Sequence, residues 1–304
     1  MQEHTCDVLI LGGGPAGYTA ALYAARAGLS AIVAEKMAAG GQMAITPEID
    51  NYPGFDEGVS GFALGVKMQK GAERFGARTV TGEVLSVDLS GREKVATLRD
   101  ARITAKSVII ATGASPRKLG LFGRGVSYCA SCDGMFYRDK TVVIVGGGNT
   151  AAEDALLLSK VCKKVMLVHR RDTLRASKIY RTALERAENV EFIWNSTVKE
   201  LLASERVRGV ILQNVRTEEI REAECDGIFI SIGRTPDTTL FKGLVTLDEG
   251  GYIIADESTK TNVRGVFAAG DVRTKAMRQI VTAAADGAVA AHFAEEYIAE
   301  EFEN

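Results

Sequence analysis

Two glycine-rich loops, each between a short apolar segment and a helix-like segment, limit the folds open to this chain more than any other feature. The loops span residues 12–17 (GGGPAG) and 146–151 (GGGNTA). In each copy, 23 positions separate the first glycine from the residue that ends the next strand-like segment, Glu35 or His169. Strand, glycine loop, helix and strand in this order are typical of a dinucleotide-binding unit. We therefore expect an α/β fold with two Rossmann-like, three-layer nucleotide-binding domains.

The expected elements of the two copies follow from apolar runs and from glycine and proline punctuation. The first copy is expected to contain a strand at 7–11, a helix at 15–28 and a strand at 31–34. The second is expected to contain a strand at 141–145, a helix at 149–160 and a strand at 164–168.

Two turn-like segments indicate where one domain is inserted into the other. They are 111–116 (ATGASP) and 233–236 (GRTP), each after a strand-like run, and they bracket the second glycine loop. We expect a first domain at 1–113 that resumes at 238–304, and a second domain at 114–237. Two linkers at one place would form a double hinge, although ordinary surface turns would have the same composition.

Composition and charge exclude several classes of protein. Hydrophobic residues make up 46% and charged residues 25% of the 304 residues, and the net charge is −2. These values are those of a globular chain with no basic field for nucleic acid. No apolar stretch is long enough to span a membrane, and the N-terminus lacks a basic signal region. We expect a cytoplasmic protein.

The five cysteines include one close pair, Cys129 and Cys132, while Cys6, Cys162 and Cys225 stand alone. In a reducing compartment, a Cys-x-x-Cys pair is redox-active or metal-binding rather than structural. A structural zinc in a non-catalytic nucleotide-binding regulator is the alternative. Zinc needs four ligands, and the remaining histidines and cysteines show no paired spacing, so we expect no metal.

The residue that ends the second strand indicates which ribose each loop accepts. Glu35 can take both ribose hydroxyls and would repel a 2′-phosphate, which suits FAD or NAD. The second copy has no acid there and reads His169-Arg170-Arg171, with Arg175 four residues after Arg171, where both could project from one helical face. Arginines form charge-assisted bonds to phosphate, and two such contacts would favour NADPH over NADH by about two orders of magnitude.

With these residues in view, the chain resembles the low-molecular-weight thioredoxin reductases along essentially its whole length. The position of the cysteine pair, just before the second glycine loop, is specific to that family. The motifs that support the resemblance are 12–17, 40–42 (GGQ), 51–54 (NYPG), 111–113 (ATG), 129–133 (CASCD), 146–151, 169–175 (HRRDTLR), 265–271 (GVFAAGD) and 278–279 (RQ).

The resemblance implies FAD in the first domain, NADPH in the inserted one, and a set of site residues. The implied FAD residues are Gly12, Gly14, Pro15, Ala16, Glu35, Lys36, Gly41, Gln42, Asn51, Val84, Ala111, Thr112, Gly113, Gly270, Asp271, Arg278, Gln279 and Ile280. The implied NADPH residues are Gly148, Asn149, Thr150, Glu153, His169, Arg170, Arg171, Arg175, Ile232 and Gly233.

The resemblance also implies a catalytic route. Cys132 is the sulfur next to the flavin, Cys129 exchanges with thioredoxin, and Asp133 protonates the leaving thiolate. The expected activity is NADPH-dependent thioredoxin-disulfide reduction by a homodimer, with a rotation of the inserted domain between half-reactions.

The chain departs from the family at two places near the pair. The connection 117–128 is short, and Met135 stands where an aromatic residue is usual. Arg124 and Phe136 still match positions that contact the protein partner. These departures leave the physiological partner open.

Two related enzymes are alternatives. A flavoprotein of a peroxide-reducing system usually has its thioredoxin-like carrier as an N-terminal extension, whereas here the first strand is expected to begin at residue 7. A ferredoxin–NADP reductase on the same scaffold would lack the cysteine pair.

Overall fold

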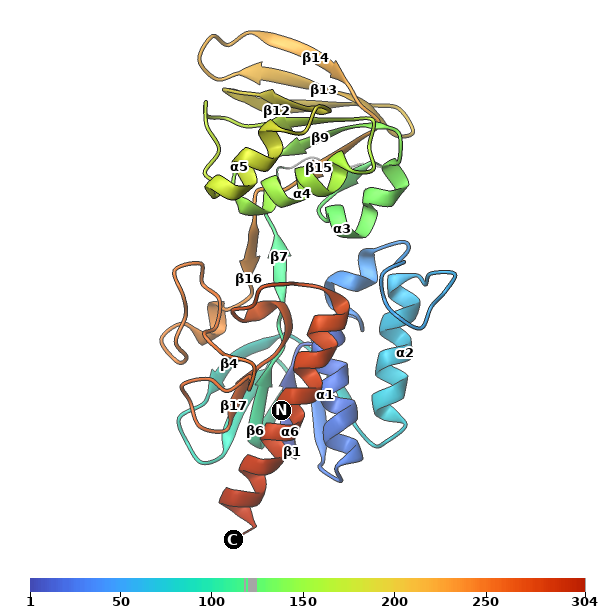
Figure 1. Cartoon of the computed structure of the whole chain (residues 1–304). Helices are drawn as coiled ribbons and strands as arrows, with labels where there is room; N and C mark the ends of the chain where they lie inside the picture. The colour runs from blue at the N-terminus through green and yellow to red at the C-terminus, as the bar shows by residue number, and fades with distance from the viewer. Residues whose placement is uncertain (118, 120–124, 304) are drawn as a thin grey trace. The chain divides into compact units, whose positions relative to one another are not determined.

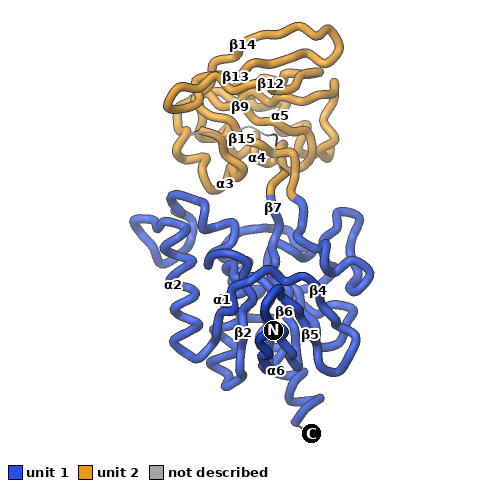
Figure 2. Tube along the Cα trace, turned by 180° about the vertical axis from the view of Figure 1, so that it is seen from behind, with its two compact units in different colours: residues 1–115, 235–304 blue, residues 116–234 orange. Residues whose placement is uncertain are grey.

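The computed structural model describes residues 1–117, 119 and 125–303, which form two compact units (Figures 1 and 2). Unit 1 comprises residues 1–115 and 235–304, and unit 2 comprises residues 116–234. Unit 2 is therefore an insertion in the sequence of unit 1. The connecting segments contain β7 (Ala114–Pro116) and β16 (Arg234–Pro236), which pair as a two-stranded sheet.

Unit 1 is built on a seven-stranded sheet. Its strands are β1 (Gln2–Leu11), β2 (Ala31–Glu35), β3 (Arg78–Thr81), β4 (Val84–Asp88), β5 (Lys94–Leu98), β6 (Ala101–Ile110) and β17 (Val266–Ala268). Its helices are α1 (Pro15–Arg26), α2 (Gly61–Glu73) and α6 (Ile280–Phe302), with the 3-10 turns η1 (Gly41–Ile45), η3 (Thr239–Phe241) and η4 (Gly270–Val272).

The central strands of this sheet run parallel. The order is β3-β2-β1-β6-β5-β4, and β17 pairs with the C-terminal half of β6. β1 pairs in parallel with β2 and β6, whereas β5 runs antiparallel to β6 and β4. The loops that follow β1 and β6 therefore leave the same edge of the sheet, which is where such folds bind their ligands.

Both faces of the unit 1 sheet are buried, which explains why β1 is apolar without a break near its end. Val8 and Ile10 face α1, α2 and α6, while Leu9 and Leu11 face a second core with β4, β5 and the segment 241–272. Successive strand residues point to opposite faces, so a strand covered on both sides is continuously hydrophobic. The result is a three-layer unit.

α1 and α6 pack closely because small residues line their contact (Figure 1). A Cβ atom on Gly287 of α6 would lie 2.2 Å from the Ala16 carbonyl oxygen of α1. Any side chain at Gly287 would push the two helices apart. The small residues therefore bring α6 against the start of α1, beside the first glycine loop.

Unit 2 repeats the three-layer plan. Its strands are β8 (Val126–Ser127), β9 (Thr141–Val145), β10 (Lys164–Val168), β11 (Val190–Ile193), β12 (Ser196–Ala203), β13 (Val207–Asn214), β14 (Ile220–Glu224) and β15 (Gly227–Ile230). Its helices are α3 (Ala130–Asp133), α4 (Asn149–Ser159) and α5 (Lys178–Glu185), with the 3-10 turn η2 (Gly134–Tyr137).

The main sheet of unit 2 is parallel, in the order β11-β10-β9-β15-β8. Val142 and Ile144 of β9 face a core shared with α3, α4 and α5, and Val143 and Val145 face one shared with the antiparallel sheet β12-β13-β14. The second glycine loop follows β9 at the carboxyl edge. The α/β fold with two Rossmann-like units is thus confirmed.

The part of the chain that the structure describes contains no helix that is both long and apolar enough to cross a membrane.

Candidate active site

The first glycine loop connects β1 to α1 at the carboxyl edge of the unit 1 sheet. Gly12 has φ +108°, and a Cβ there would lie 2.5 Å from the Ala111 carbonyl oxygen, so the position requires glycine. Gly14 is the N-cap of α1 and Pro15 its first residue. Because Gly14 has no side chain to cap the helix, the first-turn N–H groups can face an anionic ligand such as a pyrophosphate.

Glu35, at the end of β2, is fixed over this loop. One carboxylate oxygen accepts the Gly13 N–H at 2.7 Å, and the other accepts the Met37 N–H at 3.0 Å. Oxygen lone pairs remain for further donors. The carboxylate is therefore held where a ribose bound at the loop would present its hydroxyls.

The other residues predicted to bind FAD lie around the first glycine loop and the carboxyl edge of the unit 1 sheet. Gly40 N–H donates to the Gly13 carbonyl at 2.8 Å, so η1, with Gly41 and Gln42, begins against the loop. After β6, the Thr112 hydroxyl donates to the Asp237 carbonyl at 2.7 Å. Lys36 forms an exposed ion pair with Glu83, and Val84 begins β4.

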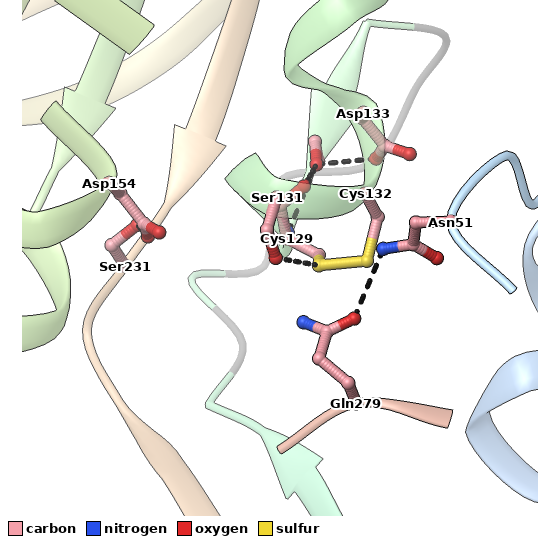
Figure 3. The surroundings of a disulfide bond; sticks show 9 residues. Asn51, Cys129, Ser131, Cys132, Asp133, Asp154, Ser231 and Gln279 are labelled. Carbon is pink, nitrogen blue, oxygen red and sulfur yellow. Dashed lines mark hydrogen bonds between the residues drawn. A yellow bond between two sulfur atoms is a disulfide. The ribbon is translucent and has the colours of Figure 1, made fainter. Parts of the chain in front are cut away.

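The segment 270–280 brings further predicted residues together. Asn51 Nδ2 donates to Gln279 Oε1 at 3.2 Å, as Figure 3 shows. Gln279 is the N-cap of α6, and Ile280 is its first residue. The predicted FAD residues Asn51 and Gln279 thus contact each other although 228 positions separate them.

Arg278 binds the backbone of its own segment. Its guanidinium donates to the carbonyl oxygens of Asp271 and Arg273, at 3.4 and 3.2 Å, and lies 4.0 Å from the centre of the Tyr252 ring. These contacts hold the segment in a bend that places η4, with Gly270 and Asp271, beside the start of α6.

Sequence reasoning missed a buried ion cluster behind this segment. Asp286 of α6 accepts hydrogen bonds from Arg273, from Lys275 at 2.8 Å and from the Gly270 N–H at 2.9 Å. Burial opposes ionisation of Asp286, but these donors outweigh it and lower the pKa of its carboxyl. Asp286 stands in an alanine-rich stretch of the sequence, and a lone carboxylate on an apolar helix is the signal that could have found it.

The second glycine loop connects β9 to α4 in unit 2, and here too a glycine is the N-cap of the helix. Gly148 is the N-cap of α4, whose first turns expose Asn149, Thr150 and Glu153. A Cβ on Gly147 would lie 2.2 Å from the His169 ring.

His169 is 6% exposed, and its Nε2 has no hydrogen-bond partner among the described residues. Burial and the neighbouring arginines lower the pKa of His169, so it is neutral at neutral pH.

The arginines of this site lie in a bend, and the expectation that Arg171 and Arg175 share a helical face is wrong. α5 begins at Lys178. The chain folds back after β10 because Arg175 N–H donates to the Gly147 carbonyl at 2.7 Å. Leu174 is buried between exposed neighbours. The exposed Arg170, Arg171 and Arg175 still follow β10 beside the glycine loop, and Ile232 and Gly233 follow β15 at the same edge of the sheet.

Cys129 and Cys132 form a disulfide around the short helix α3 (Figure 3). Their Cα atoms are 5.3 Å apart, and Cys129 is the N-cap residue. The other three cysteines are buried, and burial raises their pKa values to about 12, 11 and 12 for Cys6, Cys162 and Cys225. Such thiols remain protonated and unreactive. Among the described residues, Cys129 and Cys132 are therefore the redox-active cysteines.

Asp133 ends α3 next to the disulfide. Burial raises the pKa of its carboxyl, although a hydrogen bond from Ser127 opposes the shift. A protonated carboxyl beside a disulfide can supply a proton to a departing thiolate. Sequence reasoning missed Ser127, because nothing in its spacing to Asp133 signals a contact.

A second carboxyl–hydroxyl pair lies within unit 2, between Asp154 of α4 and Ser231, which follows β15 (Figure 3). The Ser231 hydroxyl donates to Asp154. Burial raises the pKa of Asp154, and this hydrogen bond opposes the rise. This pair too was not expected from the sequence.

The residues expected to bear on partner recognition lie only partly within the described structure. Met135 and Phe136 of η2 are exposed next to α3, 57% and 45% respectively. Arg124 lies outside the described residues, as do residues 118 and 120–123 of the short 117–128 connection. Within the described ranges, no group of three or more His, Cys, Asp or Glu side chains could hold a metal ion.

Comparison with known proteins agrees with this geometry. Residues 6–287 match the profile of the pyridine nucleotide-disulphide oxidoreductases. A thioredoxin reductase of Peptoclostridium acidaminophilum is 46% identical over 99% of this chain and 100% of its own length. One of Streptomyces clavuligerus is 47% identical over 96% of this chain and 94% of its own. The crystal structure of thioredoxin reductase from Streptococcus pyogenes superposes with a TM-score of 0.91 at 45% identity, covering 97% of this chain and 99% of that one.

Proposed function

Because this chain belongs to the low-molecular-weight thioredoxin reductases of the pyridine nucleotide-disulphide oxidoreductase family, we propose that it reduces thioredoxin with electrons from NADPH. The family uses a flavin and a pyridine nucleotide, and the finer assignment of FAD to unit 1 and NADPH to unit 2 is part of the proposal. The observation that supports it most is the Cys129–Cys132 disulfide, with Asp133 beside it, in the same unit as the second glycine loop.

The assignment of the two nucleotides follows from charge. Glu35 would accept ribose hydroxyls and repel a phosphate, which favours FAD at the first loop. Arg170, Arg171 and Arg175 are exposed beside the second loop and would bind a 2′-phosphate, which favours NADPH. The unpartnered Nε2 of neutral His169 adds one hydrogen-bonding atom at that site.

The overall reaction converts NADPH, one proton and a thioredoxin disulfide into NADP⁺ and a thioredoxin dithiol. FAD, when bound, supplies the two-electron relay between the nicotinamide and the enzyme disulfide. Reduction breaks the Cys129–Cys132 bond and leaves a dithiol on unit 2. Cys129, Cys132 and Asp133 carry out the remaining steps.

Thiol exchange then proceeds in two displacements. The Cys129 thiolate attacks the substrate disulfide, forms a mixed disulfide and releases one substrate thiolate, which takes a proton from Asp133. Cys132 next attacks the Cys129 sulfur, which restores the enzyme disulfide and releases the second substrate sulfur. Asp133 regains its proton from the Cys132 thiol as that sulfur attacks. The proton that Cys129 lost on forming its thiolate ends on the second substrate sulfur, so the enzyme loses two protons, the substrate gains two, and atoms and electrons balance.

Three further elements of the proposal come from the family resemblance. The enzyme is a homodimer, its location is cytoplasmic, and the inserted unit rotates between the half-reactions. Light scattering of the purified enzyme and cell fractionation would test the first two.

The function is tested with purified enzyme and thioredoxin. We expect a flavin absorption spectrum and NADPH-dependent insulin reduction that requires thioredoxin. Cys129→Ser and Cys132→Ser should each abolish insulin reduction while NADPH still bleaches the flavin anaerobically, because hydride transfer precedes thiol exchange. A flavin-free protein, or thioredoxin reduction that survives in either variant, would contradict the proposal.

A further inference from the structure

Ser127 lies beside the segment 129–133, which contains the Cys129–Cys132 disulfide. Its position is set by strand pairing in the unit 2 sheet. It is the last residue of β8, where it pairs with Phe229 of β15, and it is 5% exposed. A buried hydroxyl needs hydrogen-bond partners, since an unpaired one loses its hydration without compensation. The partners of Ser127 are found in the Cys-x-x-Cys segment.

The hydroxyl of Ser127 forms hydrogen bonds with both Cys129 and Asp133. Its oxygen accepts the backbone N–H of Cys129 at 3.1 Å and donates to Asp133 Oδ2 at 2.6 Å. The Cys129 carbonyl oxygen is also within reach, at 3.3 Å. A hydroxyl has one proton and can donate to one acceptor at a time. The shorter contact, to a carboxylate, is the stronger bond.

Among the residues that the structure describes, few other charged groups surround the Asp133 carboxyl. Tyr137 of η2 is the titratable side chain in electrostatic contact with it, and burial raises the pKa of Tyr137 as well. Around Tyr137 lie Arg206, Cys225 and Asp226. The Cys129–Cys132 disulfide on α3 itself has no charge. Ser127 is therefore the group in the described chain that donates a hydrogen bond to this carboxyl.

We propose that Ser127 is a positioning residue for thiol exchange: its hydroxyl anchors the Cys129 backbone and holds the Asp133 carboxyl in place beside the redox pair. The inference rests on the proposed function, in which Asp133 is the proton donor. It adds a residue to that mechanism that does not itself touch the reacting sulfurs.

A change in pH dependence distinguishes this role from a purely structural one. Without the hydroxyl, the half-buried carboxyl keeps its proton to higher pH. The alkaline limb that Asp133 controls, where activity falls as pH rises and the carboxyl ionises, then moves to higher pH. A hydrogen bond to a charged group corresponds to a shift of about one pH unit.

The test compares pH profiles of kcat/KM for thioredoxin in the flavin-loaded enzyme. Ser127→Ala should move the alkaline limb by about one pH unit to higher pH, and Ser127→Thr, which keeps the hydroxyl, should restore the original profile. Ser196→Ala is the matched control, because Ser196 is also buried in unit 2 and donates to a backbone carbonyl, that of Trp194, at 2.8 Å. This control should leave the profile in place.

The Asp133→Asn background separates the two hypotheses. If Ser127→Ala moves the limb in the wild-type background and Asp133→Asn removes that limb in both the wild-type and the Ser127→Ala backgrounds, the proposal is supported. If Asp133→Asn removes the limb but Ser127→Ala alone leaves it unmoved, Ser127 has no positioning role and the proposed function stands. If Asp133→Asn leaves the limb intact, Asp133 is not the donor and the proposal for Ser127 fails with it.

A second measurement does not depend on turnover. The Asp133 carboxyl can be titrated by ¹³C NMR in the oxidised enzyme, with Asp133→Asn providing the assignment, and Ser127→Ala should raise its ionisation midpoint. An unchanged midpoint would overturn the proposal. Flavin absorbance and its anaerobic bleaching by NADPH verify that each variant is folded.

Discussion

Removing the charge of Asp286 is the most informative perturbation of stability that this structure suggests. The Arg273 side chain is 2% exposed and the Lys275 side chain 6%, and Asp286 is the buried anion that both contact. In Asp286→Asn the shape is kept, but the amide directs N–H donors at groups that are themselves donors. Two buried cations would then lose their buried counter-charge, and Glu257, whose carboxylate lies 3.9 Å from the Arg273 guanidinium, has a fully exposed side chain.

The expected loss is large because one partner of a buried charged network is removed. Breaking a buried ion pair in this way costs about 3–5 kcal/mol. For a unit of this size, 1 kcal/mol changes the melting temperature by about 2–4 °C, so we expect unit 1 to melt about 6–20 °C lower. Replacing Asp286, Arg273 and Lys275 together by apolar residues should cost less, because no buried charge is left without a partner.

Calorimetry of the flavin-free protein measures this directly, and Glu83→Gln is the control. Glu83 and Lys36 are 2.7 Å apart, but their side chains are 54% and 61% exposed. Solvent screens such a pair, so the control should melt like the wild type. If Asp286→Asn melts within about 1 °C of wild type, the cluster is solvated and the reasoning is wrong.

The same carboxyl predicts a dependence on pH. The folded state lowers the pKa of Asp286, so its contribution to stability is present above the unfolded pKa and is lost as pH falls through the lower, folded value. The wild type should therefore lose more of its free energy of unfolding than Asp286→Asn as pH decreases below about 4. Parallel curves for the two proteins would show that Asp286 is not ionised in the folded state.

Two predictions concern the second nucleotide site. Replacing Arg170 and Arg171 by alanine should lower kcat/KM for NADPH by about 100-fold, or about 3 kcal/mol, and leave NADH turnover nearly unchanged; an equal loss with both cofactors would point to a disrupted fold instead. Gly147→Ala should raise KM for NADPH about tenfold or more with flavin content unchanged, because the added Cβ would meet the buried His169 ring at 2.2 Å and such overpacking costs about 1–3 kcal/mol. Steady-state kinetics would check both, and normal NADPH kinetics in the glycine variant would refute the close approach.

The sequence alone determined the features that depend on neighbouring residues. The strands 141–145 and 164–168 were predicted with the bounds that the structure has, because short apolar runs between glycine and charged residues define them. The first strand was predicted from residue 7, whereas β1 begins at Gln2, since the alternating polar residues before Asp7 are held by pairing with β6. The Cys-x-x-Cys spacing likewise predicted a pair that forms a disulfide.

The tertiary structure alone decided which side chains and backbone groups form hydrogen bonds with one another. Ser127 reaches Asp133 because β8 is held against β15, about 100 positions later, and Asp286 reaches Gly270 because α6 packs back over the sheet. Arg175 lies in a bend in which its N–H donates to the carbonyl of Gly147, in the second glycine loop. The periodicity and spacing of residues in the sequence predict only which residues share a turn or one face of a helix or strand. The energy of a buried hydrogen bond or ion pair depends on which partner the folded chain brings to it, and that is set by packing across the whole unit.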